Sequence, residues 1–423
     1  MENDNKDINC SFCQKNRNEV RHMIAGPSIN GYQLYICDSC VDTCVDAMYD
    51  QESNDDGKFK LDELDYTPSV IKDYLDQFII GQDEAKKIVG ISIYNHYKRI
   101  YRDIPSDSTE LDKSNLLLIG PSGSGKTLIV KSVSKLFNIP YVIADATTIT
   151  EAGYVGDDVV QLLTRLIKNA NGDVEEAKRG IIFIDEVDKI ARKSESSTVN
   201  KDVSGEGVQQ ALLKLIEGAV VNVPHPDNPS DTIMFDTKDI LFIASGAFVD
   251  LTRIIKENRK TSSIGIGASI NGDDASKQIL HDVQPEDLIK FGLIPEFVGR
   301  LPVVVVLEAL TTEMLVRILK EPKNNLVAQF NKLFKIDGVE LMFDDKYIEN
   351  IAEQSIKRGT GARGLRSIME KTLKDIQFEL PDLAKQGLQK VLIDGAGQLK
   401  YTYKTKQKQP RKKQMKANDG KKA

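Results

Sequence analysis

Apolar residues follow different patterns along the chain, and these patterns divide it into segments. Between residues 67 and about 306, runs that are apolar throughout alternate with stretches of helical periodicity. Runs of this kind are typical of strands buried on both faces, and the alternation is typical of βαβ units around a parallel sheet. The predicted strands are 115–120, 140–146, 180–185 and 239–245.

The pattern changes after about residue 310. Helical stretches near 311–334, 345–357 and 361–378 occur together with short strand-like runs at 339–343 and 390–394. This combination predicts a smaller α+β domain. Beyond residue 404 the periodicity ends and Lys and Arg predominate, which is typical of a disordered basic tail.

The length of 423 residues exceeds what one hydrophobic core usually supports, about 250–300 residues. An acid-rich polar segment follows the N-terminal cysteines and predicts a linker. The expected organisation is a cysteine module at 1–49, a linker at 50–66, a large domain at 67–307, a small domain at 308–403 and a tail at 404–423.

Composition excludes some classes of protein. Hydrophobic residues make up 40% of the chain, which argues against general disorder, and no apolar run is long enough to span a bilayer. The N-terminus is polar and acidic, unlike a secretory signal, so we expect a cytoplasmic protein. The net charge of −6 argues against a surface built for nucleic acid.

The five cysteines all lie near the N-terminus, and four of them form two CxxC pairs, Cys10 with Cys13 and Cys37 with Cys40. Two such pairs can supply four thiolates to one tetrahedral Zn²⁺, which would be structural because no coordination position stays open. A segment this short needs such an ion to fold. Two disulfides or a redox CxxC are the alternatives, and neither suits a cytosolic chain without a thioredoxin-like setting. Cys44 is interpreted as a buried small side chain, with a spare ligand as the alternative.

The sequence GPSGSGKT at 120–127 matches the phosphate-loop pattern and lies between a predicted strand and a predicted helix. Its glycines allow backbone N–H groups to surround a β-phosphate, Lys126 reaches the β- and γ-phosphates, and Thr127 binds Mg²⁺. A glycine-rich turn before a helix would not explain the Lys-Thr pair. The predicted ATP contacts are Gly120, Pro121, Ser122, Gly123, Ser124, Gly125, Lys126, Thr127 and Leu128.

Two carboxylates, Asp185 and Glu186, end the predicted strand that comes about 58 residues later. Asp185 suits the Mg²⁺ site through its water shell, and Glu186 suits the base that orients the attacking water. Acidic residues end many strands, but together with the phosphate loop this pair predicts ATP hydrolysis.

These motifs resemble the ClpX family of the AAA+ superfamily over residues 10–403. The resemblance implies a homohexameric ring that binds ATP between subunits, unfolds tagged or unfolded proteins through its pore and passes them to a ClpP-type peptidase. It also implies adaptor binding by the zinc module, without peptidase activity in this chain. The stretches that carry it are the cysteine module, 78–86, 120–128, 144–156, 181–190, 289–303 and 359–368.

Several site residues follow only from this resemblance. The segment Ile79-Ile80-Gly81-Gln82 matches the lining of the adenine pocket, although packing on the small domain would also explain it. Arg300 matches the finger that reaches a neighbour's γ-phosphate, and Arg363 matches a sensor of nucleotide state. A surface ion pair and helix-end solvation are the respective alternatives. The pore loop that grips substrate is matched by Gly153, Tyr154, Val155 and Gly156.

The chain departs from the family pattern in two loops. The peptidase-docking loop is Ile264-Gly265-Ile266, with an aliphatic side chain where the family usually has Phe, so docking is expected to be weaker or altered. The basic pore-entrance loop is replaced by the segment 224–231, which puts the usual tag preference in doubt. A stand-alone unfolding chaperone, a ring ATPase acting on nucleic acid and a non-hydrolysing scaffold remain as alternatives.

Overall fold

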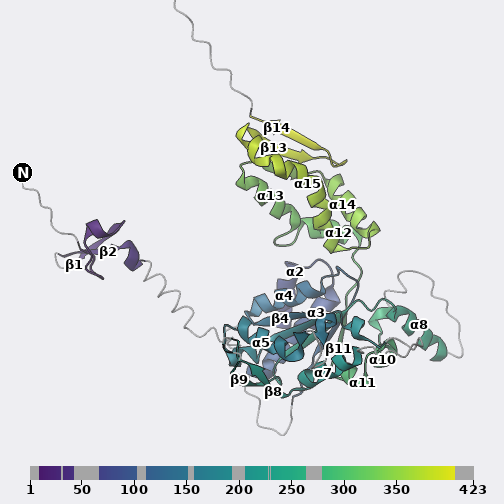
Figure 1. The fold of residues 1–423 in the computed structure, drawn as a ribbon. Helices are drawn as coiled ribbons and strands as arrows, with labels where there is room; N and C mark the ends of the chain where they lie inside the picture. The colour runs from purple at the N-terminus through teal and green to yellow at the C-terminus, as the bar shows by residue number, and fades with distance from the viewer. Residues whose placement is uncertain are drawn as a thin grey trace, which may run out of the picture. The chain divides into compact units, whose positions relative to one another are not determined.

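The structure is a computed structural model, and it describes residues 9–29, 32–41, 66–101, 111–150, 157–192, 205–226, 228, 230–262 and 279–404. The chain forms two compact units, Met1–Lys60 and Leu61–Ala423. Figure 1 shows the elements of each unit, which are described separately below. Apart from Tyr66 and Lys404, the predicted linker and tail lie outside the described residues, and the predicted domain boundaries stay predictions.

The first unit contains a small antiparallel hairpin. A short 3-10 helix, η1 (Arg17–Glu19), precedes β1 (Met23–Ile29), which pairs with β2 (Tyr32–Cys37), and Met23 lies opposite Cys37. Asn16 caps η1, where its side chain accepts a hydrogen bond from the Asn18 backbone N–H at 3.1 Å. The hairpin thus ends at a cysteine, and a helical turn begins at the next residue.

The second unit contains a five-stranded parallel sheet, as the apolar runs predict (Figure 1). All four predicted strands are present. The sequence analysis did not include the fifth, β11, although its four valines follow the same apolar pattern. In spatial order the strands are β11 (Val303–Val306), β3 (Leu116–Ile119), β10 (Leu241–Gly246), β7 (Ile181–Asp185) and β4 (Tyr141–Asp145).

Helices flank this sheet, and local signals fix where several of them begin and end (Figure 1). Thr67 caps α2 with its side chain and Pro68 occupies the first turn, while Gly292 ends α10 in a left-handed conformation. The helices are α2 (Pro68–Asp76), α3 (Asp83–Tyr101), α4 (Lys126–Phe137), η3 (Ala146–Thr148), α5 (Val159–Asn169), α6 (Val174–Ala177), η4 (Val187–Ile190), α7 (Gly205–Glu217), α8 (Leu251–Ser262), α10 (Pro285–Phe291) and α11 (Pro295–Gly299).

Two small strand pairs lie outside the central sheet. A short parallel pair, β5 (Ile149–Thr150) and β6 (Asp157–Asp158), follows β4, and an antiparallel hairpin joins β8 (Val220–Pro224) to β9 (Thr232–Asp236). One hydrophobic cluster, which includes Leu117, Phe242 and Leu212, fills the space between one face of the central sheet and helices such as α5 and α7. This cluster holds the carboxyl ends of the parallel strands in place, where ligands bind in folds of this kind.

The C-terminal part has a hydrophobic cluster of its own, which includes Leu315, Phe334 and Leu373. Its strands are β12 (Glu340–Phe343), β13 (Leu388–Ile393) and β14 (Leu399–Tyr403), and its helices are α12 (Thr312–Lys320), α13 (Leu326–Ile336), α14 (Asp345–Lys357) and α15 (Ala362–Lys385). The predicted α+β character is confirmed. The helical stretch predicted near 311–334 forms two helices, α12 and α13, with a break between them around Pro322, whose ring removes a backbone N–H and disfavours continuation of α12.

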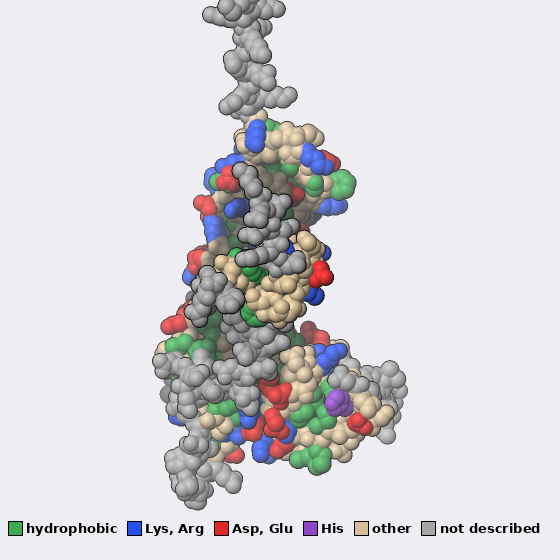
Figure 2. Space-filling model, turned by 90° about the vertical axis from the view of Figure 1, so that its left-hand side faces the viewer, with side chains coloured by type: hydrophobic (Ala, Val, Ile, Leu, Met, Phe, Trp, Pro, Cys, Tyr) green, Lys and Arg blue, Asp and Glu red, His purple; other side chains and the backbone are tan. Residues whose placement is uncertain are grey.

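Among the described residues, no helix has both the length and the apolar character needed to cross a membrane. Figure 2 shows one face of the molecule, on which acidic and basic side chains of the described residues alternate without forming a continuous basic surface.

Candidate functional site

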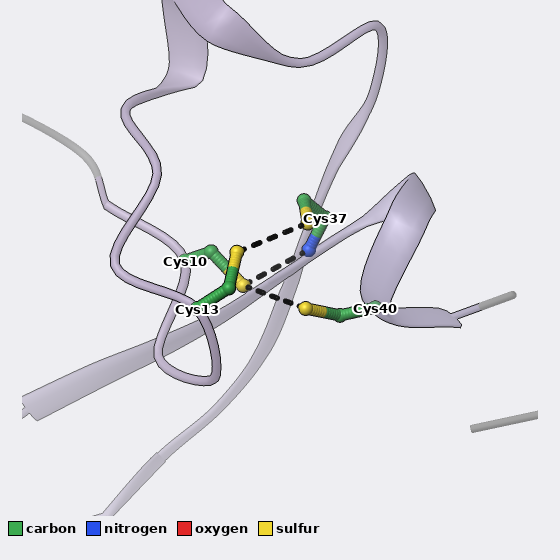
Figure 3. Close-up of side chains that lie close together, drawn as sticks. All are labelled: Cys10, Cys13, Cys37 and Cys40. Atoms are coloured by element: carbon green, nitrogen blue, oxygen red, sulfur yellow. Dashed lines mark hydrogen bonds between the residues drawn. The ribbon is translucent and has the colours of Figure 1, made fainter. Parts of the chain in front are cut away.

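The four predicted zinc ligands lie together in the first unit (Figure 3). Their sulfur atoms are all within 4.8 Å of one another, with 3.8 Å between Cys10 and Cys40 and 3.6 Å between Cys13 and Cys37. Zn–S bonds of about 2.3 Å in a tetrahedron place neighbouring sulfurs about 3.8 Å apart. The thiols therefore fit one tetrahedral Zn²⁺. Cys44 lies outside the described residues.

Backbone hydrogen bonds shape the loop that carries Cys10 and Cys13. The loop after Cys10 turns back through Gln14, whose φ of 64° is left-handed and whose N–H donates to the Cys10 carbonyl at 2.9 Å. Burial acts to raise the pKa of Cys10, but N–H donors of the backbone outweigh it and lower the pKa to about 6. The hydrogen bond with Cys13 and burial raise the pKa of Cys40. A bound cation would replace the protons for which these thiols compete.

The phosphate loop has the backbone geometry that its glycines predict. Gly123 and Gly125 have φ angles of 79° and 107°, which other residues rarely adopt. Among the described residues no side chain caps the N-terminus of α4, which begins at Lys126, so its first N–H groups are available to a phosphate. The Ser124 hydroxyl is buried and has no hydrogen-bond partner in the described part of the chain. The loop therefore fits a bound polyphosphate.

Lys126 is buried and donates to the loop's own carbonyl oxygens, at 2.6 Å for Gly120 and 3.0 Å for Pro121. Burial lowers the pKa of this lysine, and the charge of Arg363 lowers it further against the attraction of Asp185. A buried cation at the phosphate position is stabilised when an anion binds beside it.

Asp185 ends β7 directly beside the phosphate loop. The Thr127 hydroxyl lies 3.4 Å from one of its oxygens, and the other accepts the backbone N–H of Glu186 at 3.0 Å. A hydroxyl and a carboxylate at this spacing fit Mg²⁺, which prefers few protein ligands together with phosphate oxygens. Glu186 is half-buried in a left-handed turn with φ of 59°, which directs the chain away from the strand immediately after Asp185.

Two further polar residues at this edge were missed in the sequence analysis. The Ser245 hydroxyl, at the end of β10, donates to Asp185, and Asp188 is a buried carboxylate that accepts the Phe248 N–H at 3.4 Å. Ser245 could have been found, because it closes an apolar strand that runs parallel to β7. Both residues tie the end of β7 to the end of β10.

The C-terminal part reaches the phosphate loop through α15. A Cβ on Gly123 would lie 3.0 Å from the Thr360 carbonyl oxygen and 3.1 Å from the Ala362 nitrogen, and a Cβ on Gly361 would lie 3.1 Å from the Ser122 carbonyl oxygen. The two loops are thus in backbone contact. This contact brings Arg363, in the first turn of α15, near enough to influence Lys126.

The segment from Ile79 to Gln82 lies between the two domains. Ile79 and Ile80 are buried, and a Cβ on Gly81 would overlap the Met314 side chain of α12. The Gln82 side chain donates to the Glu308 carbonyl at 2.9 Å and accepts its N–H at 2.8 Å. The structure therefore shows the packing on the small domain, and the role in an adenine pocket stays a prediction.

Comparisons with known families match three parts of the chain. Residues 8–50 match the ClpX C4-type zinc finger, residues 111–304 match an AAA domain of the Cdc48 subfamily, and residues 310–390 match the C-terminal D2-small domain of ClpB protein. This is the domain set of ClpX. Together with the phosphate loop, it makes the chain an ATPase of the Clp chaperone type that binds zinc and nucleotide.

Arg300 lies away from its own phosphate loop in this ClpX-type chain. Its carbonyl accepts the Asn115 side chain at 3.0 Å, and Asn115 precedes β3, whereas the phosphate loop follows β3. Its guanidinium donates to Glu217 through Nε and Nη2, each at 3.1 Å. The surface ion pair considered in the sequence analysis is thus present within the chain.

The remaining candidate loops are only partly described. The pore loop at 153–156 and the docking loop at 264–266 lie outside the described residues, so their roles stay predictions. The segment 224–231, which replaces the family's basic pore-entrance loop, connects β8 to β9. The His225 N–H donates to the Asp231 carbonyl at 2.9 Å across this connection.

Proposed function

We propose that this chain is the ATP-driven unfoldase of a Clp protease. It would assemble as a homohexamer in the cytoplasm, pull tagged or unfolded proteins through a central pore and deliver them to a ClpP-type peptidase ring. The domain set supports an ATPase chaperone, and the single observation that favours a ring is the position of Arg300.

Arg300 is too far from its own nucleotide site to serve it. β3 separates Asn115, which bonds the Arg300 carbonyl, from Gly120, and a strand of this length spans about 13 Å. An arginine with a fixed charge and half-exposed side chain suits contact with the γ-phosphate of an adjacent subunit. Its present partner, Glu217, is exposed enough for the bond to exchange on assembly.

The residues around the phosphate loop have the roles that hydrolysis requires. Lys126 would exchange its bonds to the loop carbonyls for bonds to phosphate oxygens, and Thr127 with Asp185 would hold Mg²⁺, which neutralises phosphate charge. Glu186 would orient the attacking water and accept its proton. Arg363 would report the phosphate state to the small domain through the contact between Gly123 and Gly361.

Movement of the small domain would be transmitted to Tyr154, whose bulk grips a polypeptide without reading its sequence. The loop from Ile264 to Ile266 would dock on the peptidase, and the zinc module would recruit adaptors.

The test uses a stable fluorescent protein that carries a degradation tag. ATP-dependent loss of fluorescence without peptidase would establish unfolding, and fragments that appear only with peptidase would establish docking through the Ile266 loop. Fluorescence loss without fragments would leave a stand-alone chaperone. Unchanged fluorescence with an active ATPase would exclude the proposed function.

The ring is tested by mixing subunits. Arg300→Ala and Lys126→Ala should each abolish ATP hydrolysis alone, because one lacks the finger and the other cannot bind phosphate. In mixed rings, the intact phosphate loop of an Arg300→Ala subunit can lie beside the intact Arg300 of a Lys126→Ala subunit. Part of the ATPase activity should therefore return. No recovery in mixtures that co-assemble would contradict action between subunits.

A further inference from the structure

A polar groove lies beside β4, the edge strand of the central sheet. It has a volume of about 650 Å³, and its walls come from the end of α4, from β4 and from α5. Three basic side chains line it, Lys131, Arg165 and Lys168, together with a single acidic residue, Glu176. The three cations are exposed, and none forms an ion pair with a described carboxylate.

The groove is not suited to an additional β-strand. The carbonyl oxygens of Tyr141 and Ile143, on the free edge of β4, accept hydrogen bonds from Asn169 at 2.8 Å and from Arg165 at 2.9 Å. A strand that paired here would have to displace both side chains. Only one nitrogen of the Arg165 guanidinium is used in this way, so its other donors can still bind an anionic ligand.

A strongly acidic segment of the same chain directly precedes Tyr66, a residue that packs close to the groove. Tyr66 packs edge-to-face on Phe137, with 4.9 Å between ring centroids, and its hydroxyl donates to the Leu136 carbonyl at 3.4 Å. The residues that follow Phe137, Asn138 and Ile139, line the groove. The segment 61–65, which directly precedes Tyr66, has the sequence LDELD and carries three carboxylates.

We propose that the groove formed by Lys131, Arg165 and Lys168 is the docking site for the acidic segment 61–65 of the same chain. The charges are complementary, three carboxylates against three cations and one carboxylate. The reach is sufficient, because five extended residues span about 17 Å from the anchor at Tyr66. The covalent connection gives the segment an effective concentration of order mM, so weak exposed ion pairs suffice.

Docking here would fix the point from which the tether of the zinc module leaves the ATPase domain. The same strand that borders the groove, β4, leads through η3 and β5 into the segment predicted to form the pore loop. A bound tether would thus lie against the strand from which that loop departs. This inference does not depend on the proposed unfolding activity.

The chain contains no tryptophan, so a single introduced tryptophan reports on its own surroundings alone. Leu64→Trp introduces a unique fluorophore within the acidic segment, and acrylamide, being uncharged, measures its exposure without electrostatic bias. In the full-length protein we expect the segment to be protected, and Arg165→Glu with Lys168→Glu to increase the quenching constant by about threefold. High salt should have the same effect, since exposed ion pairs are screened.

The matched control is Lys371→Glu with Lys374→Glu, which reverses two exposed lysines at the same spacing on α15. It changes the net charge equally and should leave quenching unchanged. Adding Asp62→Lys and Glu63→Lys to the groove variant should restore protection. Unchanged thermal unfolding and ATPase rates of the groove variant verify that its fold is intact.

Three results would overturn the proposal. Quenching could be insensitive to the groove variant, the control could change it as much, or the charge swap could fail to restore protection. Protection that increases with protein concentration would assign the groove to the segment of a second copy and would equally exclude docking within one chain.

Discussion

In the zinc module, Cys10 and Cys37 are the only residues of hydrophobic type that are fully buried among those described. Around the phosphate loop, by contrast, a continuous apolar cluster extends from Leu117 through Ile184 to Ile294. The described residues of the first region are organised around the thiols and include almost no core, whereas the second region has a core that positions a ligand site at its edge.

This difference determines how each region depends on what it binds. Removing the metal from the cysteine cluster takes away most of the free energy that holds the module folded. Removing a polar group from the nucleotide site changes chemistry at the sheet edge but leaves the buried cluster intact. The predictions below test that contrast, from the largest expected effect to the smallest.

Loss of zinc should unfold the N-terminal module alone. Cys37→Ser, or a strong chelator, removes a stabilisation of about 10–16 kcal/mol, so amides in residues 9–41 should exchange at unprotected rates. The melting temperature of the ATPase domain should not change. Cys44→Ser is the control and should keep the bound zinc. Retained protection in the metal-free protein would show that the module has a core after all.

Loss of a catalytic group should leave the ATPase domain folded. Glu186→Gln keeps the size of the side chain but cannot accept a proton, so kcat should fall by about 10²–10⁴-fold while ATP affinity is kept. Steady-state hydrolysis, nucleotide binding and thermal unfolding measure these effects. Glu175→Gln, on α6, should behave like the parent. Hydrolysis by Glu186→Gln at the parent rate would exclude the assigned role.

Sequence patterns predicted those features that depend on neighbouring residues. The strands that lead into Gly120 and end at Asp185 are apolar throughout, and the CxxC spacing brings each pair of thiols to one turn. The sequence analysis did not predict features that join distant segments, such as the hydrogen bond from Ser245 to Asp185 or the hydrogen bond from the Glu308 N–H to Gln82. Such contacts depend on strand order and domain packing, which no local pattern contains. That Arg300 lies at the other end of β3 from the phosphate loop became evident only from the hydrogen bond that the Asn115 side chain donates to the Arg300 carbonyl.

The apolar core should also make the ATPase domain sensitive to acid. Burial, with the charges of Arg99 and Lys113, lowers the pKa of His96 to about 3, below its ordinary value of 6.5. The unfolded chain therefore binds a proton that the folded chain excludes, so stability falls as the pH decreases from 6.5 towards 3. At pH 5 the loss attributable to this residue is about 2 kcal/mol.

The comparison variant is His96→Phe, which fills the same buried position without titrating. Between pH 7 and pH 5 the free energy of unfolding of this variant should decrease by about 2 kcal/mol less than that of the parent. Denaturant unfolding at both pH values measures the difference. Equal decreases in the two proteins would mean that the imidazole does not titrate on unfolding in this range.

The smallest effect is the difference between two glycines of the phosphate loop that have different surroundings. Both have positive φ, so alanine at either position strains the backbone by about 1–3 kcal/mol and should weaken ATP binding. A Cβ at Gly125 meets no described atom within 4 Å, whereas a Cβ at Gly123 lies 3.0 Å from the Thr360 carbonyl. Gly123→Ala should therefore also displace the small domain, at a further cost of about 1 kcal/mol, or fivefold in affinity.

Combination with Arg363→Ala separates strain from contact. If the contact at Gly123 is what brings Arg363 to the phosphates, removing Arg363 should cost little more once Gly123→Ala is present, whereas its cost should persist in Gly125→Ala. ATP affinity in the single and double variants provides the two cycles. Equal coupling at both glycines would mean that the small domain does not act through this contact. The nucleotide site would then depend on the core of the large domain alone.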